Sequence, residues 1–174
     1  MADKKTVQDL LTDEIKDLYS AEKQLTKAIP KMVKGSNDQT LKKAFSDHLK
    51  ETEAQVARLE EIGKLLEASP AGKKCVGMEG CIKEGGEALE ETGEDHILDL
   101  GIIGAGTRVE HYEMAAYMTA ISLAQRIGAK DVVKLLQESL AEEQGAEQKL
   151  RSIGSALLKN APAGDGKAQA KASA

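Results

Sequence analysis

Four glutamates of this 174-residue chain stand where an amphipathic helix would turn an apolar side chain toward a protein core. They are Glu22, Glu51, Glu113 and Glu142. Glu22 and Glu51 are 29 residues apart, as are Glu113 and Glu142. A buried carboxylate must be paired, protonated or bound to a metal ion, because burial of an isolated charge is strongly unfavourable. Several carboxylates at one level of a core would also repel one another, and divalent cations relieve that repulsion. The pattern therefore predicts a carboxylate-rich site for divalent metal ions.

Further candidate ligands lie within one helical turn of these glutamates. His48 precedes Glu51 by three residues, and Glu110 precedes Glu113 by the same step. Both pairs would lie on one face of a helix. For His48, a core histidine hydrogen-bonded to a neighbouring carboxylate is the preferred interpretation, and metal ligation is the alternative.

Nearer the end of the chain, two adjacent acids compete for one ligand position. The angle around the helix does not decide which of Glu142 and Glu143 is the ligand. The repeated 29-residue spacing favours Glu142, and Glu143 remains the alternative. The full set of candidate metal-binding residues is Glu22, His48, Glu51, Glu110, Glu113, Glu142 and Glu143.

The scarcity of histidine bears on which metal would bind. In di-iron and di-manganese carboxylate proteins, two helices each supply a Glu-x-x-His motif. Here that motif would need histidine at position 54 and at 145 or 146, where Ala54, Gly145 and Ala146 stand. A site of mostly oxygen ligands suits manganese, calcium or magnesium about as well as iron. We expect two divalent ions per chain, iron or manganese, and assign no catalytic residue from the sequence.

Four long helices are predicted to position these side chains. Apolar residues recur at steps of three and four along residues 6–34, 38–67, 95–127 and 131–158, which is the spacing of an amphipathic helix. Residues 68–94 contain six glycines and predict a long crossover that carries one short helix at 78–91. Two helical hairpins joined by one long crossover indicate an all-α, ferritin-like antiparallel four-helix bundle. The four glutamates lie near the midpoints of their helices, so we expect them at one level of the bundle.

An internal repeat supports this arrangement. When the chain is shifted by 91 residues, the second hairpin aligns with the first without a gap, and Glu22 and Glu51 fall on Glu113 and Glu142. Hydrophobic positions agree as well, as does Gly63 with Gly154. Two amphipathic hairpins share apolar positions in any case, so the matching acids are the informative part of the repeat.

Composition excludes several classes of protein. Net charge is −5 and only 2% of residues are aromatic, which argues against binding to nucleic acid or to an anionic membrane surface. No apolar run reaches membrane-spanning length and no hydrophobic leader begins the chain, so the expected location is the cytoplasm, where Cys75 and Cys81 would be free thiols. We expect one domain over residues 1–159 and a disordered tail rich in Ala, Gly and Lys over 160–174.

The chain also resembles the YciE/YciF-like bacterial stress-response family of the ferritin-like superfamily. The resemblance rests on the blocks LYSAEKQL at 18–25, HLKET at 48–52, VEHYE at 109–113 and LAEE at 140–143, and it covers residues 6 to about 158. It implies a rubrerythrin-like helical bundle, commonly a homodimer, that is induced under stress and carries a metal site.

Two functions from different classes follow from these observations. The first is a stress-response protein with a carboxylate-rich dinuclear-type metal site, which would oxidise Fe(II) or remove peroxide with oxygen or peroxide as the small oxidant. The sequence leaves open whether the protein is an enzyme. The second is a metal-free dimeric helical scaffold or interaction protein that retains a buried polar core, and the missing Glu-x-x-His motifs favour it.

Overall fold

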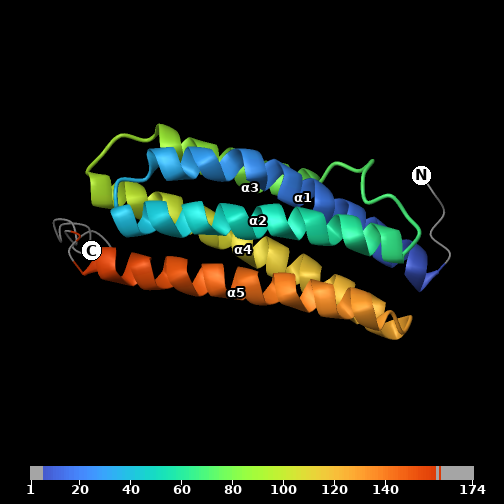
Figure 1. Ribbon diagram of the computed structural model, residues 1–174. Helices are drawn as coiled ribbons and strands as arrows, with labels where there is room; N and C mark the ends of the chain where they lie inside the picture. Colours follow the sequence, from blue (N-terminus) through green and yellow to red (C-terminus); the bar gives the residue numbers. More distant parts are fainter. Residues whose placement is uncertain (1–5, 160, 162–174) are drawn as a thin grey trace, which may run out of the picture.

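The computed structural model describes residues 6–159 and 161, and this part of the chain forms five helices and no strand (Figure 1). The helices are α1 (Val7–Gly35), α2 (Gln39–Leu65), α3 (Val76–Glu90), α4 (Asp95–Arg126) and α5 (Lys130–Leu158). The four long helices and the short crossover helix are confirmed, and their ends differ from the predicted ones by at most two residues. The predicted disordered tail lies, apart from residue 161, outside the described residues.

The four long helices form an antiparallel bundle. α1 pairs with α2 and α4 pairs with α5, while α1 also packs against α4 and α2 against α5. Figure 1 shows that the crossover from α2 to α4 travels the length of the bundle, and α3 within it covers α1 and α4 from outside. The predicted bundle with one long central connection is therefore confirmed. No helix in the described ranges is both long enough and apolar enough to cross a membrane.

Polar side chains fix the beginnings of the first two helices. Thr6 and Asp9 form a capping box at the start of α1, in which each side chain accepts a hydrogen bond from the backbone N–H of the other residue. Asp38 caps α2 by accepting from the N–H of Leu41. The carboxylate of Asp99, at the start of α4, accepts from the N–H groups of Asn37 and Asp38 at 2.7 Å each. This buried acid ties the α1–α2 turn to α4 and needs no further partner.

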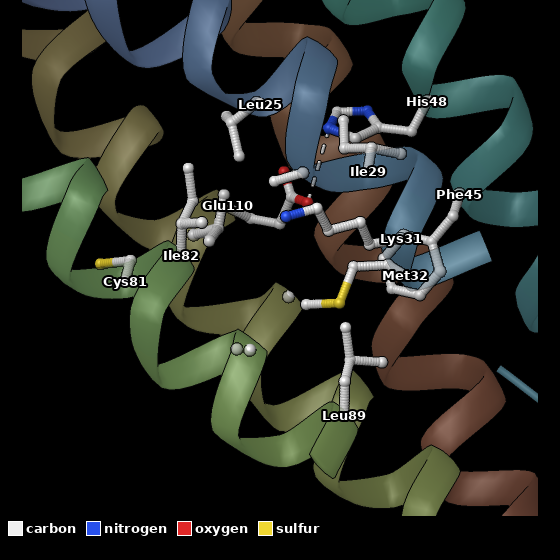
Figure 2. A pocket seen from close by; sticks show the side chains of 15 residues that line it. Leu25, Ile29, Lys31, Met32, Phe45, His48, Cys81, Ile82, Leu89 and Glu110 are labelled. Atoms are coloured by element: carbon white, nitrogen blue, oxygen red, sulfur yellow. Dashed lines mark ion pairs between the residues drawn. The ribbon is translucent and has the colours of Figure 1, made fainter. Parts of the chain in front are cut away.

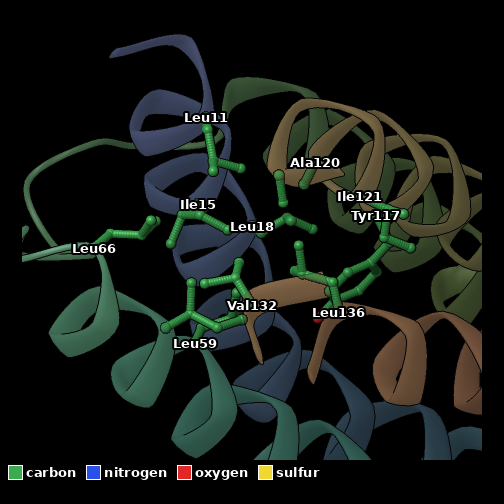
Figure 3. Packing of buried hydrophobic residues seen from close by; sticks show 12 residues of the cluster. Leu11, Ile15, Leu18, Leu59, Leu66, Tyr117, Ala120, Ile121, Val132 and Leu136 are labelled. Carbon is green, nitrogen blue, oxygen red and sulfur yellow. The ribbon is translucent and has the colours of Figure 1, made fainter. Parts of the chain in front are cut away.

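Two apolar clusters fill the bundle on either side of a polar layer. Leu18 belongs to the first cluster and Leu25 to the second, and Glu22 lies between them on α1. Figure 3 shows the first cluster, in which Leu18, Leu59 and Leu136 come from three different helices and point toward one another. The polar layer therefore lies in the interior of the bundle, covered by aliphatic side chains above and below.

The crossover is held in place where α3 begins. The backbone N–H of Cys75 donates to the Ser20 hydroxyl at 2.8 Å, and the Gln24 amide donates to the Cys75 carbonyl at 3.0 Å. The buried Cys75 thiol lies 3.0 Å from the Tyr112 hydroxyl of α4. Cys75 thus links the crossover to α1 and α4.

Candidate metal centre

Five titratable side chains meet in the polar layer, and each is at most 5% exposed. Three of the four long helices supply one residue each and α4 supplies two: Glu22, His48, Glu110, Glu113 and Glu143. One potential ligand atom from each of His48, Glu110, Glu113 and Glu143 lies within 4.8 Å of the other three. We call these five residues the acidic cluster.

Helical phase explains why these residues face inward. On α5 the buried positions advance by three or four residues, from Val132 and Leu136 to Ser139 and then Glu143. On α2 the same steps lead from Leu41 through Phe45 to His48. Each polar side chain therefore continues an apolar stripe and occupies a position that the bundle must bury.

Apart from contacts between carboxyl groups, Glu22 with Glu113 and Glu110 with Glu143, most polar atoms of the acidic cluster have no hydrogen-bond partner. Seven of the eight buried side-chain atoms without one, among the residues that the structure describes, belong to the cluster or to the adjoining Gln55. They are Glu22 Oε2, His48 Nε2, Gln55 Oε1, Glu110 Oε2, both carboxylate oxygens of Glu113 and Glu143 Oε2. Native proteins leave few such groups, and each one calls for an explanation. Their concentration in one layer makes the acidic cluster a candidate binding site.

Burial and mutual repulsion act strongly on the carboxylates. Burial raises the pKa of Glu22 well above its usual range, and the neighbouring Glu143 carboxylate raises it further. The same two causes, in the same order, raise the pKa of Glu110. For Glu113, burial again contributes most to the raised pKa, and Glu22 is the next cause. Without cations, burial and repulsion thus both favour the protonated form more than water does.

Tyr117 provides one hydrogen bond at the edge of the cluster. Its hydroxyl, fully buried in α4, donates to Glu22 Oε1 and lowers the pKa of that carboxyl against the larger effect of burial. Tyr19 lies three residues before Glu22 in the sequence, and Tyr117 four residues after Glu113. Tyr19 instead donates to the exposed Glu60 at 2.9 Å, so only Tyr117 adjoins the acidic cluster.

Glu51 was expected to take a core position and does not. Its side chain is 29% exposed, and one carboxylate oxygen lies 3.1 Å from His48 Nδ1. The other oxygen lies 3.5 Å from Lys149 Nζ of α5. The hydrogen bond with His48, above all, lowers the pKa of Glu51. Glu51 therefore orients the histidine from outside the acidic cluster.

Glu142, the acid that the repeat favoured over Glu143, also lies outside. Its carboxylate is 27% exposed and accepts two hydrogen bonds from the Arg58 guanidinium, at 2.6 and 2.8 Å. Gln55 donates to Glu142 Oε2 at 2.9 Å and to Glu143 Oε1, which connects this ion pair to the cluster. Glu143 takes the buried position because it continues the stripe of α5, whereas Glu142 lies about 100° around the helix from it.

The 91-residue repeat reappears in these ion pairs. Glu51 of α2 pairs with Lys149 of α5, and Glu142 of α5 pairs with Arg58 of α2. The shift that aligns Glu51 with Glu142 also aligns Arg58 with Lys149. The matching acids thus mark two related ion pairs across the α2–α5 interface. Sequence reasoning missed Arg58 and Lys149, although a basic residue seven positions after Glu51 and after Glu142 was a visible signal.

The chemistry of the acidic cluster suits divalent cations. Four buried carboxylates carry as much negative charge, when ionised, as two divalent ions would neutralise. His48 adds one imidazole nitrogen, a ligand that suits iron or zinc, whereas carboxylates suit manganese, magnesium or calcium. The other histidines lie apart from the cluster; His111 is 60% exposed and lies 3.8 Å from Glu147.

Comparison with known proteins shows similarity along nearly the whole chain. The family model described as "Domain of unknown function (DUF892)" matches residues 6–162. Protein YciF of Escherichia coli (strain K12) is 39% identical over 153 residues, which cover 86% of this chain and 90% of that protein.

Two solved structures share the fold at a similar level of identity. The crystal structure of the E. coli stress protein YciF superposes with a TM-score of 0.88 at 36% identity, covering 91% of this chain and 100% of that one. YcfI from Rhodopseudomonas palustris superposes with a TM-score of 0.82 at 38% identity, covering 85% of this chain and 94% of that one. The described bundle is thus the fold of these relatives.

Proposed function

Because this chain belongs to the YciF-like family described as DUF892, we propose that it is a stress-response protein whose acidic cluster binds two divalent metal ions. The E. coli relative is described as a stress protein, which supports the stress-response part of the proposal. The metal site comes from the residues of this chain.

One observation carries the proposal: buried carboxylate and imidazole atoms without hydrogen-bond partners are concentrated at one level of the bundle. Buried Asp99 is a useful contrast, because two backbone N–H groups satisfy its carboxylate fully. A cluster that served packing alone would be expected to pair its atoms in the same way. Cations supply the partners that Glu113 and its neighbours lack.

The residues that would hold the metal are the five of the acidic cluster, with Glu110, Glu113, Glu143 and His48 closest together. Four carboxylates and two divalent cations together are neutral, which removes the repulsion that raises the pKa of Glu22, Glu110 and Glu113. Of the ions that carboxylates and one imidazole can bind, iron or manganese is the one we propose.

Iron bound at this site would supply electrons to a small oxidant, either dioxygen or peroxide, which is the chemistry by which such a protein protects a cell. The chain's own residues prepare the site for it. Glu51 fixes the His48 ring, Tyr117 holds Glu22 through its hydroxyl, and the two apolar clusters exclude bulk water from the layer between them. Whether turnover follows from binding is a separate question for an oxidase or peroxidase assay.

Thermal unfolding with and without metal tests the proposal. Chelator-treated protein should gain stability when Fe(II) is added without oxygen, or when Mn(II) is added, by about 2.7 kcal/mol for each ion bound at a hundredfold excess over its dissociation constant. Glu113→Gln should lose most of this gain, while Glu142→Gln, an equal change outside the cluster, should retain it. If neither ion stabilises the wild-type protein, the metal-free helical scaffold becomes the better account.

Family resemblance further supports a homodimer as the assembly. Light scattering coupled to size-exclusion chromatography would give the mass of the particle in solution. A mass near 18.6 kDa, that of one chain, would contradict the dimer.

A further inference from the structure

A cavity of about 80 Å³ lies against the acidic cluster and is lined by residues of α1, α2, α3 and α4 (Figure 2). Its walls are mainly aliphatic side chains, with Leu25 and Ile29 from α1 and Ile82 and Leu89 from α3. The cavity is partly open to solvent, so a small molecule can reach it from outside.

Two polar atoms mark the inner end of the cavity. His48 and Glu110 both line it, they are 5% and 2% exposed, and His48 Nε2 and Glu110 Oε2 have no hydrogen-bond partner. Figure 2 shows the imidazole and the carboxylate next to each other, joined by an ion pair of 3.5 Å. Exposed Lys31 also lines the cavity, which thus combines an apolar body, a buried polar end and a cationic side chain at the surface.

Glycines shape the wall of the cavity that α3 provides. A Cβ atom at Gly85 would lie 2.9 Å from the Met32 methyl group, so a side chain there would press on the residue that borders the cavity. A Cβ atom at Gly86 would meet no other atom within 4 Å. Glycine inside a helix is less stable than alanine by about 1 kcal/mol. Gly86 therefore leaves open space beside the cavity at a cost in helix stability.

From this geometry we infer that the cavity binds a short, mostly apolar molecule with one polar end, such as a primary alcohol of four or five carbons, and directs that end to His48 and Glu110. The volume leaves room for about five to eight non-hydrogen atoms, at roughly 10–15 Å³ for each water-sized group. A fully polar molecule would lose its hydration against aliphatic walls without compensation. The inference rests on the proposed function only in that both use the same two polar side chains.

Nuclear magnetic resonance of methionine methyl groups tests the inference directly. The chain has five methionines, and the Met32 methyl, identified through a Met32→Leu variant, reports on the cavity. Ethanol, 1-propanol, 1-butanol, 1-pentanol and 1-octanol would be titrated into chelator-treated protein. We expect a saturable shift of the Met32 signal, with affinity rising roughly fourfold per methylene until the cavity is full and then levelling off.

Two glycine variants on α3 provide matched controls. Gly86→Leu should fill the open space and abolish the saturable shift. Gly80→Leu makes the same change on the same helix, at a position that does not line the cavity. A Cβ atom at Gly80 would also meet nothing within 4 Å, so this variant should retain binding. Shifts that stay linear in alcohol concentration, or that are the same in Gly86→Leu as in wild type, would overturn the inference.

The polar end is tested by removing the hydroxyl group from the probe. 1-Chlorobutane should bind at least about fivefold more weakly than 1-pentanol, the loss of roughly one hydrogen bond. Equal affinity would contradict the role of His48 and Glu110 here. Protein that binds metal but no alcohol would overturn only this inference, whereas protein that binds alcohol but no metal would overturn only the proposed function.

Discussion

The Nδ1 atom of His48 lies 3.1 Å from a carboxylate oxygen of Glu51, and the Nε2 atom of the same ring faces the buried Glu110 and Glu143, at 3.5 and 3.6 Å. A carboxylate only accepts, so the proton of this hydrogen bond belongs to Nδ1. The lone pair of a neutral imidazole is then on Nε2, toward the acidic cluster. Histidines that bind metals are commonly oriented by a carboxylate in this way.

Glu51→Gln should therefore weaken metal binding although Glu51 lies outside the acidic cluster. Loss of such an orienting carboxylate typically lowers metal affinity by about 10–100-fold. Isothermal titration with Mn(II) would measure the affinity. Glu142→Gln is the matched control, since the repeat aligns the two residues and Glu142 contacts Arg58 instead of a histidine. Equal losses in the two variants would contradict the orienting role.

Replacement of a buried acid should change the pH dependence of stability in metal-free protein. Because burial raises the pKa of Glu113, the folded state keeps its proton at a pH where the unfolded state has lost it. Glu113 therefore lowers stability progressively as the pH rises above about 4.5, and has no such effect below that pH. Glu113→Gln should be more stable than wild type at pH 8, with a difference that shrinks toward pH 4.5.

The slope of that difference is at most about 1.4 kcal/mol per pH unit for one proton. Urea unfolding at several pH values, after treatment with chelator, would measure it. A wild-type protein that is more stable than Glu113→Gln at pH 8 without metal would show that the Glu113 carboxylate already has a partner in the bundle.

The two related ion pairs across α2 and α5 should differ in strength. Arg58 is 15% exposed and donates two hydrogen bonds to Glu142, so Arg58→Met should lower the free energy of unfolding by about 1–3 kcal/mol. Lys149 is 51% exposed and lies 3.5 Å from Glu51, so Lys149→Met should cost less than about 0.5 kcal/mol. Urea unfolding at neutral pH would give both values, and equal costs would show that exposure does not govern them.

The fold could be predicted from the sequence because its signals are local. Steps of three and four between apolar residues set the helices, and the six glycines of residues 68–94 mark the crossover. The position of the acidic cluster along the bundle could also be predicted, because Glu22 and Glu113 lie on the buried apolar faces of α1 and α4. These features require no knowledge of how the helices pack.

The choice between neighbouring polar residues could not be predicted in the same way. Glu51 follows His48 by one turn, and Glu142 adjoins Glu143, so small rotations of α2 and α5 decide which side chain is buried. The repeat favoured Glu51 and Glu142, but Arg58, which holds Glu142 outside, and Lys149, which pairs with Glu51, come from the opposite helix. The cavity beside α3 depends likewise on how closely α3 approaches the bundle, which no local pattern reports.

Two glycines that the repeat aligns should respond differently to alanine. A Cβ atom at Gly63 would lie 2.8 Å from the Ala68 carbonyl oxygen and from the Pro70 ring, so Gly63→Ala should destabilise the protein by about 1–3 kcal/mol. At Gly154 the nearest atom, on Ile103, is 3.4 Å away. Gly154→Ala should be neutral or stabilising by up to about 1 kcal/mol. Thermal unfolding would rank the two, and the opposite order would contradict the close contact at the end of α2.

The metal content of the purified protein tests the central claim most directly. Protein prepared without chelator or affinity metal would be subjected to elemental analysis beside a Glu22→Ala, Glu113→Ala double variant whose folding is checked by circular dichroism. The account predicts about two iron or manganese ions per chain, lost in the variant. The absence of stoichiometric metal in the wild-type protein, even after anaerobic loading with Fe(II) or Mn(II), would contradict it.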